Sequence, residues 1–189
     1  MAFIQCLNQL GQAQPVGGVT ALIAVLFDPC RVTELSELGR NGLAKQRWRI
    51  LLDNVDFTTQ LKLSEYAKNQ QWFELAVDAS IVAKAWDYLS LRLPNAYSEY
   101  FNAALQNLNI SKTFAMAIAR QESAWNPMAQ SSANARGLMQ LLPSTAKLTA
   151  ENNQLPYQGE QDLFKPLNNI LLGTAHLNEL NGKYPNNRI

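Results

Sequence analysis

Apolar positions recur along most of this chain at steps of three and four residues, which is the spacing of one face of an α-helix. After about residue 31, no segment of useful length alternates in the manner of a β-strand. The clearest apolar stripe consists of Trp72, Leu75, Ala76, Ala79, Val82, Ala83 and Trp86. Its tryptophans are interpreted as packing between neighbouring helices, with a preceding helix around residues 61–69 as the partner, as in helical-repeat arrays. The pattern predicts an all-α chain.

Capping residues and prolines predict where the middle helices begin and end. Pro94 marks a break ahead of a short helix at residues 97–105. Ser111 is a suitable N-cap for the next helix, because its hydroxyl can accept a hydrogen bond from a free backbone N–H. That helix should stop near Trp125, since Pro127 disfavours helical geometry in the residue before it.

The last two helices are expected to start at prolines, which fit the first turn of a helix. One should begin at Pro143, and residues 154–165 should form a loop. The other should begin at Pro166, run through Leu180 and end at Gly182.

The helix that follows Ser111 carries one acidic residue, Glu122, near its C-terminal end. A carboxylate in a last turn faces the negative end of the helix dipole, which disfavours its charged form. Apolar neighbours such as Ile118 and Ala119 would disfavour that form further by desolvation. Both effects favour a protonated group that can donate to a leaving oxygen. Glu122 is therefore the candidate general acid; the alternative interpretation is a solvated charge at a helix end.

Composition narrows the classes of function. The chain has 189 residues, is 47% hydrophobic and carries a formal net charge of +1, so nothing favours binding to nucleic acid or to an anionic membrane. The single histidine, His176, lies in an apolar helical run, and no Cys/His cluster has metal-ligand spacing, so neither a metal nor a cofactor is expected. The spacing of Cys6 and Cys30 leaves open whether the two are bridged.

The N-terminal segment gives no sign of membrane insertion or export. Its apolar run, residues 19–27, is too short to span a bilayer. A signal peptide would place a basic residue ahead of that run, and the first basic residue is Arg31.

Two motifs carry a resemblance to a known family. The run Gln121-Glu-Ser-Ala-Trp-Asn-Pro127 is followed by Ser131 and then by Gly137-Leu-Met-Gln140 with Pro143. This order resembles the signature of the soluble lytic murein transglycosylases, goose-lysozyme-like enzymes that cut bacterial peptidoglycan. The similarity covers residues 72–188 and extends more weakly back to about residue 31.

The resemblance implies a division of the chain into three parts. Residues 1–30 are an unmatched leader, expected to be disordered. Residues 31–108 correspond to the end of a superhelical helix array and a linker. Residues 109–189 correspond to a partial lysozyme-like transglycosylase domain, incomplete at its C-terminus.

The same resemblance assigns roles to individual residues. Glu122 matches the family's single catalytic acid/base. Ser131 matches a position that contacts the sugar near its N-acetyl group, Gln140 a polar residue that lines the cleft, and Leu142 a position at the cleft that is often Met. Ser123 is expected to be structural and Met139 to pack in the core.

The chain departs from the family pattern in two places. Asn134 stands where Gly is common, and the turn should survive because Asn tolerates left-handed backbone geometry. The family's next helix, which carries Ala-Tyr-Asn-Ala-Gly and grips the substrate, and a later Tyr that faces the cleft would both follow Ile189. We therefore expect a fragment that is weakly active or inactive by itself.

The resemblance also implies the reaction and its setting. Most glycosidases use two carboxylates, whereas this family uses one, with the substrate's acetamido group and 6-hydroxyl completing a 1,6-anhydro ring without water. The implied partner is the glycan strand of peptidoglycan, and the implied location is the periplasm. Two alternatives stay open, namely hydrolysis as in goose-type lysozymes and a non-catalytic helical remnant. Oligomeric state and the choice between endo and exo cleavage also stay open.

Overall fold

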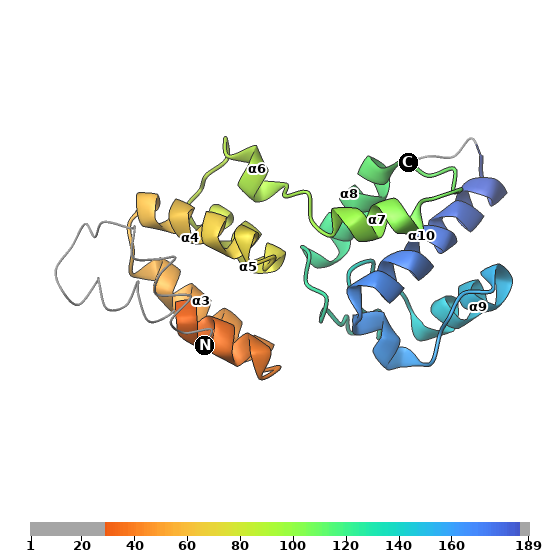
Figure 1. Cartoon of the computed structure of the whole chain (residues 1–189), viewed down its shortest axis with the longest axis horizontal. Helices are drawn as coiled ribbons and strands as arrows, with labels where there is room; N and C mark the ends of the chain where they lie inside the picture. The colour runs from red at the N-terminus through yellow and green to blue at the C-terminus, as the bar shows by residue number, and fades with distance from the viewer. Residues whose placement is uncertain (1–28, 186–189) are drawn as a thin grey trace. The chain divides into compact units, whose positions relative to one another are not determined.

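The computed structural model describes residues 29–185 (Figure 1). Within that range the chain is helical and contains no strand beyond isolated bridges in one loop, so the predicted all-α class is confirmed. Contacts divide the chain into two compact units, Met1–Pro94 and Asn95–Ile189. The three-part division expected from the sequence stays a prediction. Most of the leader, with Cys6 and the apolar run 19–27, lies outside the described residues, as do residues 186–189.

The first unit is a stack of helices around one apolar core. After a helix at residues 29–37 come α3 (Asn41–Asp53), α4 (Phe57–Asn69), α5 (Phe73–Val82) and the short α6 (Leu89–Arg92). Helix α5 packs against α3, α4 and α6, and α4 is the partner helix that the sequence pattern predicted. The core is made of Val32, Ala44, Trp48, Leu51, Leu52, Leu63, Ala67, Leu75, Ala76 and Ala79.

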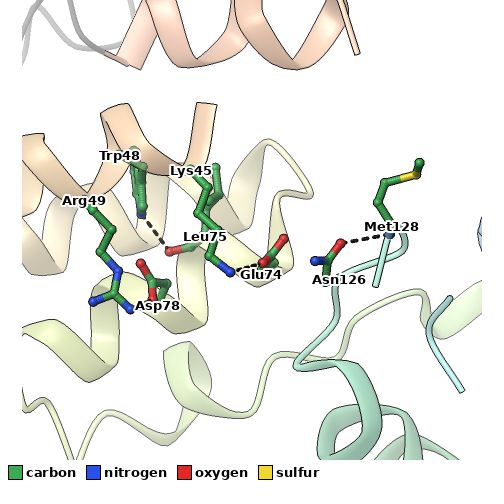
Figure 2. Close-up of polar contacts among 8 residues, drawn as sticks. All are labelled: Lys45, Trp48, Arg49, Glu74, Leu75, Asp78, Asn126 and Met128. Carbon is green, nitrogen blue, oxygen red and sulfur yellow. Dashed lines mark hydrogen bonds and ion pairs between the residues drawn. The ribbon is translucent and has the colours of Figure 1, made fainter. Parts of the chain in front are cut away.

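Polar contacts fix the register of α5 against its neighbours. The indole N–H of Trp48 donates to the carbonyl oxygen of Leu75 at 3.0 Å (Figure 2). Two ion pairs, Lys45 with Glu74 and Arg49 with Asp78, also join α3 to α5. The indole N–H of Trp48 is buried, so its bond to Leu75 satisfies a donor that would cost free energy if it were left without a partner.

The predicted stripe on α5 is correct except at its end. Leu75, Ala76 and Ala79 are buried, but Trp86 is 52% exposed. The helix ends at Val82, and Lys84 takes a left-handed backbone with φ of 52°. The periodicity therefore breaks before Trp86, whose ring instead lies under the guanidinium of Arg92 at 4.7 Å.

The second unit is built around its last helix. It contains α7 (Ser98–Ala104), α8 (Lys112–Ser123), α9 (Pro143–Asn153), the 3₁₀ helix η1 (Glu160–Phe164) and α10 (Pro166–Lys183). Helix α10 packs against α7, α9 and η1 (Figure 1). One apolar cluster consists of Leu141, Ala146, Ala150, Leu163 and Leu172. The side chains of Asn178 and Asn181 also hold the backbone of Asn109, just ahead of α8, at 3.1 and 3.2 Å.

The predicted starts of α8, α9 and α10 agree with the structure, whereas the predicted ends of α8 and α10 do not. For α4 the reverse holds, because the predicted helix at residues 61–69 ends with α4 but begins too late. Ser111 caps α8 by accepting from the N–H of Phe114 at 3.2 Å, and α9 and α10 both begin at their prolines. Helix α8 ends at Ser123, earlier than expected, because Ala124 already has a left-handed backbone. Helix α10 continues through Gly182 to Lys183, because Gly182 keeps a negative φ and the N–H of Tyr184 still bonds to the carbonyl of Leu180 at 2.9 Å.

No helix between residues 29 and 185 is both long enough and apolar enough to cross a membrane.

Candidate functional site

Glu122 is the last residue but one of α8, and its side chain is exposed. Within residues 29–185 the carboxyl group has neither a hydrogen bond nor an ion pair. The desolvation expected from the sequence is not supplied by these residues, because α8 buries Ala115 and Ala119 and leaves its last turn open. Next to it, the Ser123 hydroxyl donates to the carbonyl of Ala119 at 3.0 Å, which is a contact within the helix.

A buried tryptophan anchors the chain immediately after Glu122. Trp125 is 2% exposed, and its ring centroid lies 6.3 Å from those of Tyr97 and Phe101. Ala124 and Trp125 have φ values of 51° and 70°, a left-handed geometry that is uncommon for residues with a Cβ. The chain therefore leaves α8 abruptly, and the last turn that carries Glu122 is tied to α7 through Trp125.

The segment that follows folds into a compact loop, residues 129–141, which carries Ser131 and Gln140. A short turn leads into it, in which the N–H of Met128 bonds to the Asn126 side chain at 2.8 Å (Figure 2). Within the loop the N–H of Gly137 donates to the carbonyl of Ala129 at 2.8 Å, and Gln130 and Leu141 each form an isolated bridge with Arg136.

Each predicted contact residue of this loop is held in place by backbone interactions. The hydroxyl of Ser131 accepts from the N–H of Ala135 at 3.0 Å, while the side chain stays exposed. The Gln140 amide nitrogen donates to the carbonyls of Ala129 and Gly137 at 3.1 and 2.9 Å. Leu142, which is 40% exposed, precedes the first residue of α9.

Asn134 has the left-handed backbone that the sequence analysis expected of it, with φ of 67°. Its side-chain oxygen accepts from Gln130 at 2.8 Å and from the Arg136 guanidinium at 3.1 and 3.0 Å. The asparagine thus fills the place of a glycine and adds contacts that a glycine cannot make.

Arg136 of the loop contacts a charged and an aromatic side chain of η1. The Arg136 guanidinium pairs with Glu160 and lies 5.4 Å from the ring of Phe164. A hydrogen bond from Lys165, followed by one from the backbone N–H of Gln158, lowers the pKa of Asp162 against the opposing effect of burial. The positive charges of Arg136 and Lys165 are thus paired with Glu160 and Asp162, in a region where Arg136 is only 9% exposed.

The predicted site residues fall into two groups. Ser131, Gln140 and Leu142 are brought together by one loop and the residue that follows it. Glu122 lies on the preceding helix, and no hydrogen bond or ion pair of the described residues joins its side chain to the other three.

Sequence reasoning missed Asn169 and Arg136, which hold the loop. An asparagine within the apolar run Asn169-Ile-Leu-Leu-Gly173 was the available signal, because a polar side chain on a buried helix face must find partners.

Among residues 29–185 no group of three or more His, Cys, Asp or Glu side chains is arranged to hold a metal ion.

Two family models match most of the chain. Residues 99–189 match the Transglycosylase SLT domain, and residues 28–89 match the Soluble lytic murein transglycosylase L domain. The chain belongs to the soluble lytic murein transglycosylase family.

Relatives of this family resemble the chain over most of its length. It is 99% identical over 158 residues to a Haemophilus influenzae protein provisionally named as a soluble lytic murein transglycosylase, covering 84% of this chain and 27% of that protein. It is 41% identical over 160 residues to the soluble lytic murein transglycosylase of Escherichia coli K12, covering 84% of this chain and 25% of that enzyme. The chain therefore spans about a quarter of the length of these curated relatives.

Solved structures agree with this assignment. The 70 kDa soluble lytic transglycosylase of Escherichia coli superposes with a TM-score of 0.81 at 37% identity, over 93% of this chain and 28% of that one. An inactive variant of the Pseudomonas aeruginosa enzyme, in which a glutamate is changed to glutamine, gives a TM-score of 0.77 at 27% identity, over 98% of this chain and 31% of that one.

Proposed function

We propose that this chain cleaves the β-1,4 bond between N-acetylmuramic acid and N-acetylglucosamine in peptidoglycan, with Glu122 as the acid and base. The observation that carries the proposal is the open carboxyl group of Glu122. It lies at the end of a helix anchored by Trp125, exposed and without a polar partner among residues 29–185, so it is free to meet a substrate.

The proposed reaction needs only this one carboxyl group. Glu122 gives its proton to the glycosidic oxygen as the bond from that oxygen to C1 of the muramic acid residue breaks. The acetamido oxygen of the substrate stabilises the positive charge at C1. Glu122, now a carboxylate, then takes the proton of the 6-hydroxyl, whose oxygen bonds to C1 and closes a 1,6-anhydro ring.

Ser131, Gln140 and Leu142 are proposed to bind the glycan. All three lie at or beside loop 129–141, where Ser131 and Leu142 are exposed. The coarser half of the proposal, action on murein, is supported by the family to which the chain belongs and by the complex of a related 70-kDa soluble lytic transglycosylase with bulgecin A. The loss of activity on a glutamate-to-glutamine change in the Pseudomonas aeruginosa relative supports an essential glutamate. We also propose a periplasmic location, where the substrate is found.

The test is the release of soluble fragments from purified cell-wall sacculi by the parent chain and by Glu122→Gln. An amide cannot donate the proton, so the rate should fall by about 10²–10⁴-fold while the helical content is retained. Glu151→Gln is the matched control, because it removes one exposed carboxylate near the end of α9. That variant should keep the parent rate.

The products separate the remaining alternatives. Fragments that end in 1,6-anhydromuramic acid support the proposed reaction, whereas reducing ends indicate hydrolysis of the goose-lysozyme type. A Glu122→Gln rate within about tenfold of the parent would refute the role of Glu122. A parent chain that releases nothing would agree with the weak or absent activity expected of this fragment, and Glu122→Gln would then be tested in a version extended by the helix that carries the family's Ala-Tyr-Asn-Ala-Gly motif. An extended version that also releases nothing would indicate a non-catalytic module.

A further inference from the structure

Asn169 is a completely buried polar residue on α10, with 0% exposure. Its side-chain oxygen accepts from the N–H of Met139 at 2.7 Å, and its side-chain nitrogen donates to the carbonyls of Arg136 and Leu163 at 2.9 Å each. One amide group thereby joins α10 to both sides of the Gly137-Leu-Met-Gln140 turn and to η1. A buried amide with this set of bonds is costly to lose, because its backbone partners would be left unsatisfied.

The turn lies so close to Asn169 that there is no room for a side chain at Gly137. A Cβ on Gly137 would stand 2.3 Å from the Asn169 side-chain nitrogen and 2.0 Å from the carbonyl oxygen of Leu163. On the next turn of α10, a Cβ on Gly173 would stand 2.4 Å from the sulfur of Met139. The backbone of the turn is therefore seated directly on α10, and Asn169 is its only side-chain hydrogen-bond partner from that helix within residues 29–185.

The clamped turn determines how Gln140 is presented. Gln140 has a left-handed backbone, with φ of 47°, and its amide nitrogen is engaged by the carbonyls of Ala129 and Gly137. Its amide oxygen makes no hydrogen bond within residues 29–185, so the side chain offers an acceptor for the N–H or hydroxyl groups of a sugar.

We propose that Asn169 is the positioning residue of the glycan site, holding the turn of residues 136–141 in the geometry that presents Gln140 to an N-acetylated sugar. This inference rests on the proposed function for the identity of the ligand, though not for the clamp itself. Asn169 touches no substrate and acts only through the turn.

A second buried polar residue on the same helix provides the control. Thr174 is also 0% exposed, but its hydroxyl donates only to carbonyls of its own helix, those of Ile170 and Leu171, at 2.8 and 3.2 Å. Thr174→Val therefore removes a buried hydrogen bond from α10 without touching the turn. Asn169→Leu keeps a similar volume and removes all the bonds to the turn.

The first measurement is backbone amide hydrogen exchange, and it needs no ligand. In the parent chain the Met139 amide should exchange as slowly as the core amides of α10, because Asn169 is its partner. In Asn169→Leu it should exchange at least about tenfold faster relative to those core amides. In Thr174→Val that ratio should stay at the parent value. Rapid exchange of Met139 in the parent would overturn the proposal even if no variant folds.

The second measurement is the affinity for a β-1,4-linked tetramer of N-acetylglucosamine, by calorimetry on variants whose circular dichroism shows them folded. Asn169→Leu should bind at least about tenfold more weakly than Thr174→Val. Equal affinities with an unchanged Met139 ratio would overturn the proposal. If the parent does not bind the tetramer, the proposed function is what fails, and the clamp is judged by exchange alone.

Discussion

Gly137 shows how a single residue can be fixed by its surroundings. Its φ of 74° is strained for any residue with a Cβ, and a Cβ would stand 2.0 Å from the backbone oxygen of Leu163. Backbone atoms cannot move aside as a flexible side chain can. Both constraints act on the turn that carries Gln140, so the glycine is required there for its conformation and for its lack of volume.

Gly137→Ala should lower the free energy of unfolding of the second unit by about 2 kcal/mol or more, from the left-handed strain and the steric clash together. Urea denaturation followed by circular dichroism measures this. Gly182→Ala is the control, because that position lies inside α10 with nothing within 4 Å of the added carbon. Equal stability of the two variants would contradict this expectation.

The role of a single residue could be predicted from the sequence where it depends on that residue's own chemistry. It could not be predicted where it depends on a partner far away along the chain. Glu122 could be singled out because it is the only acidic residue of its helix, although its role stays a prediction. Met139 was correctly expected to pack, at 6% exposure. Asn169 could not be assigned from the sequence, because its bonds reach residues 30 and 33 positions away along the chain.

Between helices α9 and α10, the carboxylate of Glu179 is contacted by side chains from both helices. Glu179 accepts from Asn152 at 3.2 Å and from Asn153 at 2.6 Å, and it lies 3.5 Å from the imidazole of His176. Burial raises the pKa of this carboxyl, but the hydrogen bonds from Asn152, Asn153 and His176 outweigh burial and lower the pKa below its ordinary value of 4.5. The carboxylate form thus joins α9 to α10.

A lowered pKa has a definite consequence for stability. The stabilisation by Glu179 is present above the pKa of the unfolded chain, about 4.5, and is lost as the pH falls through the lower pKa of the folded chain. The unfolding free energy of the second unit should therefore fall in acid below that value, and less steeply in Glu179→Gln.

Urea titrations at a series of pH values test this expectation. Asp162, whose pKa is also lowered, should leave a residual slope in Glu179→Gln. Glu151→Gln is the control, because that carboxylate has only a 4.0 Å pairing with Lys147. Parallel pH profiles for the parent and Glu179→Gln would contradict the assignment.

In α8, α9 and α10 the starts were predictable from the sequence, whereas the ends of α8 and α10 were not. Starts depend on local chemistry, since Ser111, Pro143 and Pro166 satisfy or omit the free N–H groups of a first turn. Ends depended here on tertiary contacts. Trp125 is drawn into contact with Tyr97 and Phe101, which stops α8 early, while α10 passes through a glycine that was expected to end it.

At the scale of the whole molecule, both units leave large apolar side chains in contact with solvent. In the first unit Phe57 and Tyr88 are 48% and 45% exposed and touch edge to face, beside Leu89 at 60%. In the second, Phe114 and Leu180 are 39% and 40% exposed. Burying such surface between molecules is favourable.

We therefore expect the chain to self-associate as its concentration rises, which sedimentation velocity measures directly. Replacing Tyr88 and Leu89 together by Ser and Gln should weaken this association, because both side chains are already exposed and contribute little to the core. Lys62→Gln changes an exposed polar residue of α4 and removes no apolar surface, so it should leave the self-association unaltered. A single species at all concentrations would contradict the expectation.

The reach of Asn169 along the chain also fixes an order of events during synthesis. Both motifs leave the ribosome before α10 does, so a nascent chain that ends near residue 165 contains Glu122, Ser131 and Gln140 but lacks the amide that seats the turn. Asn178 and Asn181, which hold the segment ahead of α8, emerge later still. Contacts over such separations form late, because the intervening chain must first be closed into a loop. The turn of the proposed glycan site can therefore be seated only after α10, which is made later than both motifs, has been added to the chain.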